Sequence, residues 1–188
     1  MLATAGYDKF IRIWKETKVN HFEQVYCVEA QASVNSVQFC SWEYGLILAA
    51  GCADGKVHII ERDPNDNWSH FAFEAHDAGV NGLSWGPATF PCLLLAENND
   101  VMNPAINDKA LALVPKRFVT GGLDGKVKIW QAREDNSREF ALVEELQAGG
   151  EEDWVRDVSW CNNIGISYEL IACCDEGKKL RIYKQEAN

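Results

Sequence analysis

The chain has 188 residues, of which 47% are hydrophobic, and it carries a formal net charge of -10 at pH 7. This apolar content is enough for one sizeable core and excludes a disordered chain. The acidic balance disfavours sequence-independent binding of nucleic acid, which needs clustered Lys and Arg, and the longest apolar runs are too short to span a membrane.

Four segments read almost alike and predict an internal repeat. Each begins with small and apolar residues, passes through a turn rich in Asp or Gly, and ends in an alternating stretch. They are LATAGYDKFIRIW (2–14), LAAGCADGKVHII (48–60), FVTGGLDGKVKIW (118–130) and IACCDEGKKLRIY (171–183). The turn positions Asp8, Asp54 and Asp124 include two Asp-Gly pairs, which supply the positive φ angles of a tight turn. Each segment is therefore predicted to form a β-hairpin.

A second set of segments predicts one further strand before three of the hairpins. These segments are SVNSVQF (33–39), GVNGLSW (79–85) and WVRDVSW (154–160). Less regular segments at 69–75 and 139–146 predict an outer strand after a hairpin. A four-stranded unit of roughly 40 to 45 residues is typical of β-propeller blades.

The fold class predicted is therefore all-β, an incomplete propeller arc of about three and a half four-stranded blades. We expect one propeller fragment over residues 1–188. It is divided into a partial blade (2–30), a blade (31–74), a blade with a long insert (75–147) and a last blade (148–186). The insert, residues 86–117, contains four of the five prolines and is predicted to be a surface loop. Its acidic residues lack the spacing of an EF-hand, which leaves a protein-binding or metal-binding loop as the weaker alternative.

One unit contains His76, Thr120, Asp124 and Trp130. This set resembles the buried hydrogen-bond tetrad of WD40 repeats, which implies that Asp124 holds His76, that the hydroxyl bridges, and that Trp130 closes the chain. The alternative is a catalytic His, Asp and hydroxyl group. The same Asp position recurs at Asp8 and Asp54 without a His, as expected of scaffolding rather than of one active site.

The stretch EEDWVRDVSW (151–160) places Asp153, Arg156 and Asp157 between two tryptophans. The simplest interpretation is an ion-pair seam in which acidic neighbours hold Arg156 while Trp154 and Trp160 pack between blades. A contact to a partner chain through an exposed Arg156 is the functional alternative. General acid and base chemistry by the two aspartates needs a pocket that the sequence does not indicate.

No cofactor or metal site is expected. The seven cysteines are irregularly spaced without a CxxC pair, which favours buried thiols in a reducing compartment over disulfides or zinc. The sequence has no phosphate-binding glycine loop and no Gly-x-Ser-x-Gly elbow. An enzyme is therefore not expected.

Several longer segments, DWVRDVSW, AHDAGVNGLSWGPA and RFVTGGLDGKVKIW among them, resemble the Sec-thirteen family of WD40 propellers over residues 2–183. The resemblance implies a non-enzymatic adaptor of the COPII outer coat in ER-to-Golgi transport and of the Y-shaped complex of the nuclear pore. It also implies a role in amino-acid signalling complexes upstream of a growth-control kinase. The implied partner is a helical-solenoid coat protein or nucleoporin that donates a blade, and the implied location is the cytoplasm, the cytosolic face of the endoplasmic reticulum and the nuclear pore.

Members of that family have six blades, so the chain is expected to be a fragment without the first and last, whose donor groove lies outside it. Membrane association is expected through the coat only, and no nucleic-acid partner is expected. The alternatives of similar fold are a sister nucleoporin propeller or a general WD40 module that recognises peptides.

Overall fold

The computed structural model describes residues 1–88, 115–133, 139–148, 153–162 and 168–186. The predicted insert falls mainly on residues outside these ranges, so its expected character as a surface loop lies beyond the described part of the chain. Within the described ranges, no helix is long and apolar enough to cross a membrane.

The structure is all-β, as predicted, and its strands form four antiparallel sheets. We name them sheet A (β1–β3), sheet B (β4–β7), sheet C (β8–β11) and sheet D (β12–β14). The strands are β1 Leu2–Ala5, β2 Phe10–Lys18, β3 His21–Glu29, β4 Val34–Phe39, β5 Leu46–Cys52, β6 Lys56–Arg62, β7 Trp68–Glu74, β8 Val80–Trp85, β9 Arg117–Gly122, β10 Lys126–Ala132, β11 Phe140–Gln147, β12 Val155–Trp160, β13 Tyr168–Asp175 and β14 Leu180–Glu186. The one helical element is a 3-10 turn at Trp42–Tyr44 within the described residues.

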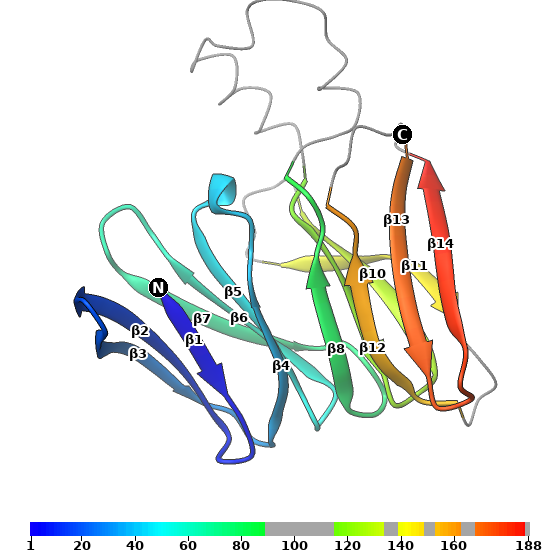
Figure 1. The fold of residues 1–188 in the computed structure, drawn as a ribbon, viewed down its shortest axis with the longest axis horizontal. Helices are drawn as coiled ribbons and strands as arrows, with labels where there is room; N and C mark the ends of the chain where they lie inside the picture. Colours follow the sequence, from blue (N-terminus) through cyan, green and yellow to red (C-terminus); the bar gives the residue numbers. More distant parts are fainter. Residues whose placement is uncertain (89–114, 134–138, 149–152, 163–167, 187–188) are drawn as a thin grey trace, which may run out of the picture.

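The sheets follow one another along an open arc, as Figure 1 shows. Within each sheet the neighbouring strands are consecutive in sequence. Sheets B and C have four strands, whereas sheets A and D have three. Residues 148–186 were expected to make a complete four-stranded blade, whereas the described residues of this segment form a sheet of three strands, β12–β14. The four sheets form the incomplete propeller arc that the repeats predicted.

Three apolar cores lie between successive sheets. The first joins sheets A and B and contains Ile11, Ile13 and Leu48, the second joins sheets B and C around Phe118, and the third joins sheets C and D around Ile129. Side chains alternate between the two faces of a strand, so Val57 and Ile59 of β6 face sheet C while Ile60 faces sheet A. The middle sheets are therefore buried on both faces.

Glycines allow the inner parts of the sheets to approach closely. A Cβ atom on Gly121 of β9 would lie 2.4 Å from Val155 Cγ1 and 2.8 Å from Val158 Cγ1, both on β12 of sheet D. A Cβ atom on Gly51 of β5 would lie 2.6 Å from Val80 Cγ1 of sheet C. The alternation of small residues in the hairpins thus sets the distance between sheets.

We expect Gly121→Ala to lower the free energy of unfolding by about 1 to 3 kcal/mol, because the added methyl group forces sheets C and D apart. Gly6→Ala is the matched control, since its Cβ atom would meet nothing closer than Asp8 Oδ1 at 4.0 Å. Chemical denaturation of both variants measures the difference. Equal stability of the two variants would show that sheet spacing does not depend on Gly121.

Candidate functional site

The structure brings His76, Thr120, Asp124 and Trp130 together in one hydrogen-bonded chain. His76 Nδ1 lies 2.9 Å from both carboxylate oxygens of Asp124, and His76 Nε2 lies 2.7 Å from Thr120 Oγ1. The indole N–H of Trp130 donates to Thr120 Oγ1 over 2.9 Å. The directions are consistent if Nδ1 of His76 carries the proton and the Thr120 hydroxyl donates to Nε2.

Each member of this tetrad comes from a different local element. His76 stands in the loop between β7 and β8, Thr120 lies on β9, Asp124 lies in the β9–β10 turn, and Trp130 lies on β10. Burial opposes ionisation of Asp124, but the hydrogen bond from His76, together with the backbone N–H of Lys126 and the charge of Lys128, outweighs it, so the pKa of Asp124 lies below its usual value. The tetrad therefore ties the loop that enters sheet C to the hairpin of that sheet.

The backbone is shaped to admit this tetrad. A Cβ atom on Gly122 would lie 2.3 Å from His76 Nδ1 and 2.5 Å from Asp124 Oδ1. Gly125 takes a φ of 74° in the turn, and Asp124 Oδ1 accepts the backbone N–H of Lys126 over 3.2 Å. The Asp-Gly turn and the preceding glycine are thus required by the same hydrogen-bonded unit.

Partial copies of the tetrad, which the sequence analysis missed, occur in other sheets. In sheet A the indole of Trp14 donates to Thr4 Oγ1 over 2.9 Å, and in sheet D the Cys173 thiol lies 3.8 Å from the Tyr183 hydroxyl. In sheet B the corresponding residues are Ala50 and Ile60, which are apolar. The Thr and Trp letters at matching places of the hairpin segments were the signal that could have found the first pair.

The turn aspartates bind their own hairpins. Asp8 accepts the backbone N–H of Phe10 and pairs with Arg12, while Asp54 accepts the backbone N–H of Lys56 over 3.2 Å. Asp175, which the sequence analysis did not single out, accepts the N–H of Lys179 over 3.0 Å and pairs with Arg181. These contacts lower the pKa values of Asp8 and Asp175.

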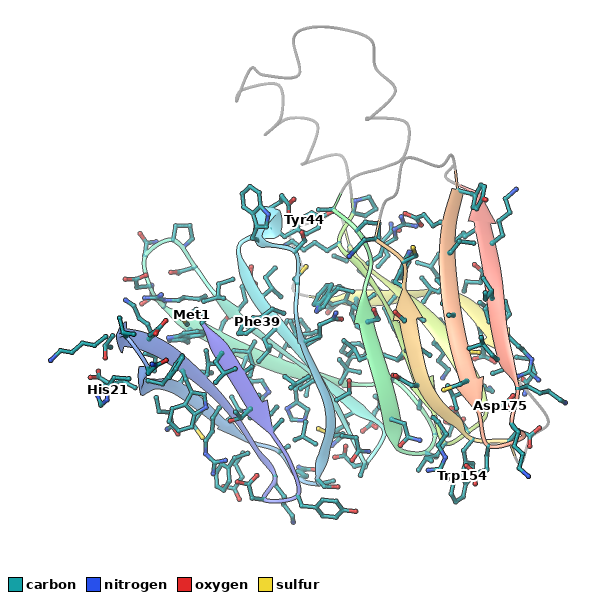
Figure 2. The ribbon with its side chains drawn as sticks, viewed as in Figure 1. Met1, His21, Phe39, Tyr44, Trp154 and Asp175 are labelled. Carbon is teal, nitrogen blue, oxygen red and sulfur yellow. The ribbon has the colours of Figure 1, made fainter. Side chains whose placement is uncertain are left out.

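Only part of the seam expected at residues 151–160 is present: Trp160 is buried between sheets C and D, whereas Arg156 pairs with a residue outside the stretch. Arg156 pairs with Glu176 of the β13–β14 turn, and its guanidinium lies over the Trp154 ring, 5.3 Å from the centroid. Asp157 Oδ1 accepts the N–H of Val158, and Asp153 lies beside Gly177. Trp154 is 45% exposed and the side chain of Arg156 is 49% exposed, so the pair belongs to the surface. Figure 2 labels Trp154 at the lower edge of the sheets, where the chain turns between the inner strands of the hairpins.

Arg156 lies at a strand position that two asparagines occupy in the preceding sheets. At the second position of β4, Asn35 donates to the carbonyl of Val80 on β8, and at the second position of β8, Asn81 donates to the carbonyl of Val155 on β12. These bonds, of 2.9 Å and 2.8 Å, link successive inner strands. Arg156 occupies the same position of β12 and turns to Glu176 instead.

A buried ion pair at the opposite end of the sheets was also missed. Arg117, where β9 begins, donates to Glu169 Oε1 on β13 over 2.6 Å, and its guanidinium lies 5.2 Å from the centroid of the Trp160 ring. Burial raises the pKa of Glu169, and Arg117 opposes that shift. The neighbouring residue Lys116 reaches Glu61 of sheet B at 4.0 Å. The end of the insert is thus attached to both neighbouring sheets.

These arrangements hold strands together and offer little for catalysis. The side chain of His76 and the whole of Thr120 have no exposed surface, so a substrate cannot reach the hydroxyl. Among the described residues, no group of three or more His, Cys, Asp or Glu side chains is placed to hold a metal ion. Of the described cysteines, Cys40, Cys52 and Cys173 are buried, and Cys27, Cys161 and Cys174 are partly exposed; all are free thiols.

We expect Thr120→Val to destabilise the protein by about 1 to 3 kcal/mol, because the isosteric change leaves the Trp130 indole and His76 Nε2 buried without a partner. Thr4→Val removes the equivalent bond in sheet A, where the surroundings are exposed, and should cost less than about 1 kcal/mol. Urea denaturation followed by tryptophan fluorescence measures both. A smaller effect at Thr120 than at Thr4 would contradict a stabilising role for the tetrad.

Arg156→Ala should leave the melting temperature nearly unchanged, because exposed ion pairs contribute little to stability. Arg117→Ala removes one partner of a buried pair and should cost about 3 kcal/mol or more. Thermal denaturation of the two variants compares them directly. A large loss at Arg156 would indicate that it is buried against another surface in solution.

The family model described as "WD domain, G-beta repeat" matches residues 112–131, which include β9, most of β10 and the Asp-Gly turn of the tetrad. The whole chain is 34% identical to "Protein SEC13 homolog" of Drosophila melanogaster over 191 residues, which is 50% of that protein. It is also 34% identical to "Protein transport protein sec13" of Aspergillus fumigatus over 197 residues, 59% of that protein.

A third relative, "Protein transport protein SEC13" of Mycosarcoma maydis, is 34% identical over 156 residues, 83% of this chain and 42% of that protein. The chain thus spans about half the length of the curated relatives that it matches. The four-sheet arc, the WD repeat at residues 112–131 and the full-length similarity all agree with the sequence motifs. Over its whole length the chain is therefore similar to SEC13 proteins, and it contains a WD repeat within an incomplete β-propeller.

Proposed function

We propose that this protein is a non-enzymatic scaffold of vesicle-mediated protein transport, a subunit of the COPII outer coat in ER-to-Golgi traffic. The observation that carries the proposal is the similarity of the whole chain to relatives named protein transport proteins. The geometry supports a scaffold, because the polar groups of the tetrad are buried and are used to join strands. Such a protein acts by presenting rigid surfaces.

The proposal includes a second assembly and a partner class. We infer that the same propeller serves in the Y-shaped scaffold of the nuclear pore and in amino-acid signalling complexes upstream of a growth-control kinase. The partner is a helical-solenoid protein that contributes a blade to the propeller, and the location is the cytosolic face of the endoplasmic reticulum and the nuclear pore. The resemblance of the sequence to the family supports these assignments.

The proposal also assigns each sheet to one blade of the propeller. We assign sheet A to a partial blade (2–30), sheets B and C to blades at 31–74 and 75–147, and sheet D to a blade at 148–186. His76, Thr120, Asp124 and Trp130 serve as the structural tetrad of the third unit, and Asp8 and Asp54 serve as turn residues. The exposed Arg156, with Trp154 beneath it, is the residue most suited to touch a partner, because Arg and Trp are enriched in the energetic centres of interfaces.

Affinity capture of the tagged chain from cells, with identification of bound proteins by mass spectrometry, tests the function. We expect a large helical-solenoid coat protein, and we expect Arg156→Ala to weaken its capture while leaving the melting temperature unchanged. Gly6→Ala serves as the matched surface control and should capture the partner normally. Capture of peptides or of no coat protein would favour the peptide-recognition alternative.

A hydrolase screen covers the remaining alternative. The protein should show no activity, and the Asp153→Ala and Asp157→Ala variants should behave like the parent chain. An activity that disappears in either variant would overturn the scaffold proposal.

A further inference from the structure

Two histidines form a stacked pair on neighbouring strands of sheet B. His58 lies on β6 and His70 on β7, with His58 Nδ1 2.9 Å from His70 Nε2. The rings are 5.0 Å apart between centroids and only 16° from parallel. At this distance the two nitrogens share one hydrogen bond, which requires one ring to donate a proton and the other to accept it.

The pair lies on the face of sheet B that packs against sheet A. His58 stands opposite Ala50, and His70 stands opposite Ile60; both of these partners belong to the core between sheets A and B. His58 is only 5% exposed, and its Nε2 atom is buried with no hydrogen-bond partner among the described residues. The imidazole therefore has one satisfied nitrogen and one that faces apolar surroundings.

Few charges are available to stabilise an imidazolium here. The ionisable groups on this face are His70 and Glu74 on β7, Lys56 and Arg62 on β6, Asp54 in the hairpin turn, Cys52 on β5, and Tyr26 on β3, which stacks on Trp68. Strands β1 and β2 contribute Ala3, Ala5, Ile11 and Ile13 to this core. Asp54 favours the charged form of His58, whereas His70 and Lys56 oppose it.

We propose that the His58–His70 pair is an acid-sensitive switch that loosens sheet A from sheet B when both imidazoles are protonated. With one neutral ring the pair keeps its hydrogen bond. With two imidazolium rings the shared acceptor is lost, and two like charges lie 2.9 Å apart, one of them on the buried ring of His58 and the other on the exposed ring of His70. Opening the face of sheet B to water relieves both costs, and sheet A is the element that covers it.

The direction of the pH effect follows from the burial of the pair. Burial, followed by the neighbouring His70, lowers the pKa of His58 from 6.5 to about 4, and burial lowers that of His70 as well. Because the closed state binds protons less readily than the open state, its stability is fully present above pH 6.5 and is lost as the pH falls toward 4. For His58 alone, the closed-to-open equilibrium constant should fall about 30-fold between pH 7.5 and pH 5.

Hydrogen exchange of the 188-residue chain at pH 7.5 and pH 5, corrected for the intrinsic pH dependence of exchange, tests the switch. We expect amides of β1–β3 and of β7 to lose protection at pH 5 while those of β8–β10 and β12 retain it. His58→Leu keeps the core apolar and removes the titrating group. In this variant the loss of amide protection between pH 7.5 and pH 5 should be at least about 10-fold smaller than in the parent chain. His21→Gln, at an exposed position of β3, is the matched control and should behave like the parent chain.

An NMR titration of the parent chain tests the same switch without a variant, in case His58→Leu fails to fold. NMR titration of the imidazole resonances in the parent chain should show one ring that stays neutral to below pH 5 and a protonation step accompanied by shifts in β1–β3. Uniform loss of protection over all sheets at pH 5, an equal loss in His58→Leu, or an ordinary titration of both rings near pH 6.5 would each overturn the proposal.

Discussion

Each sheet of this protein can bury its apolar residues only against the sheet that follows or precedes it, and the rest of the structure depends on that constraint. No single sheet closes a core of its own: the three cores lie between sheets A and B, B and C, and C and D. Small residues on the inner strands, such as Gly51 and Gly121, let neighbouring sheets come within contact distance. Hydrogen bonds such as Asn35 to Val80 then fix the lateral position of one inner strand against the next.

Within that arrangement, polar groups have two distinct uses. In sheet C the tetrad is buried and every member has a partner, so it joins a loop to a hairpin at little cost. In sheet B the corresponding positions are apolar, and polar atoms that remain nearby, Asp54 Oδ2 and His58 Nε2, are buried without a partner among the described residues. One blade thus carries a satisfied network, and its neighbour carries titratable groups whose state depends on pH.

Local features were readable from the sequence. Hairpins at Asp54-Gly55 and Asp124-Gly125, inner strands such as 79–85, and outer strands such as 139–146 all follow from alternation and turn chemistry, and they appear in the structure within one or two residues. Contacts between distant residues were not readable. Arg117 and Glu169 are 52 positions apart, and the pairing of His58 with His70 depends on the register of β6 against β7. Arg156 was assigned the wrong acidic partner because Glu176 approaches it through the β13–β14 turn rather than through the sequence neighbourhood.

The long insert of sheet C connects two strands that are already side by side. Trp85 and Phe118 are directly paired, and beyond them the N–H of Gly86 bonds to the carbonyl of Arg117 over 2.8 Å. The ladder is therefore closed at the base of the insert, and the entropy of loop closure grows only with the logarithm of loop length. Replacing roughly 30 residues by about 5 would lower the free-energy cost of loop closure by only about 1.6 kcal/mol. Insertions and deletions at this point are thus nearly neutral for folding, and the length of this connection is free to vary between lineages.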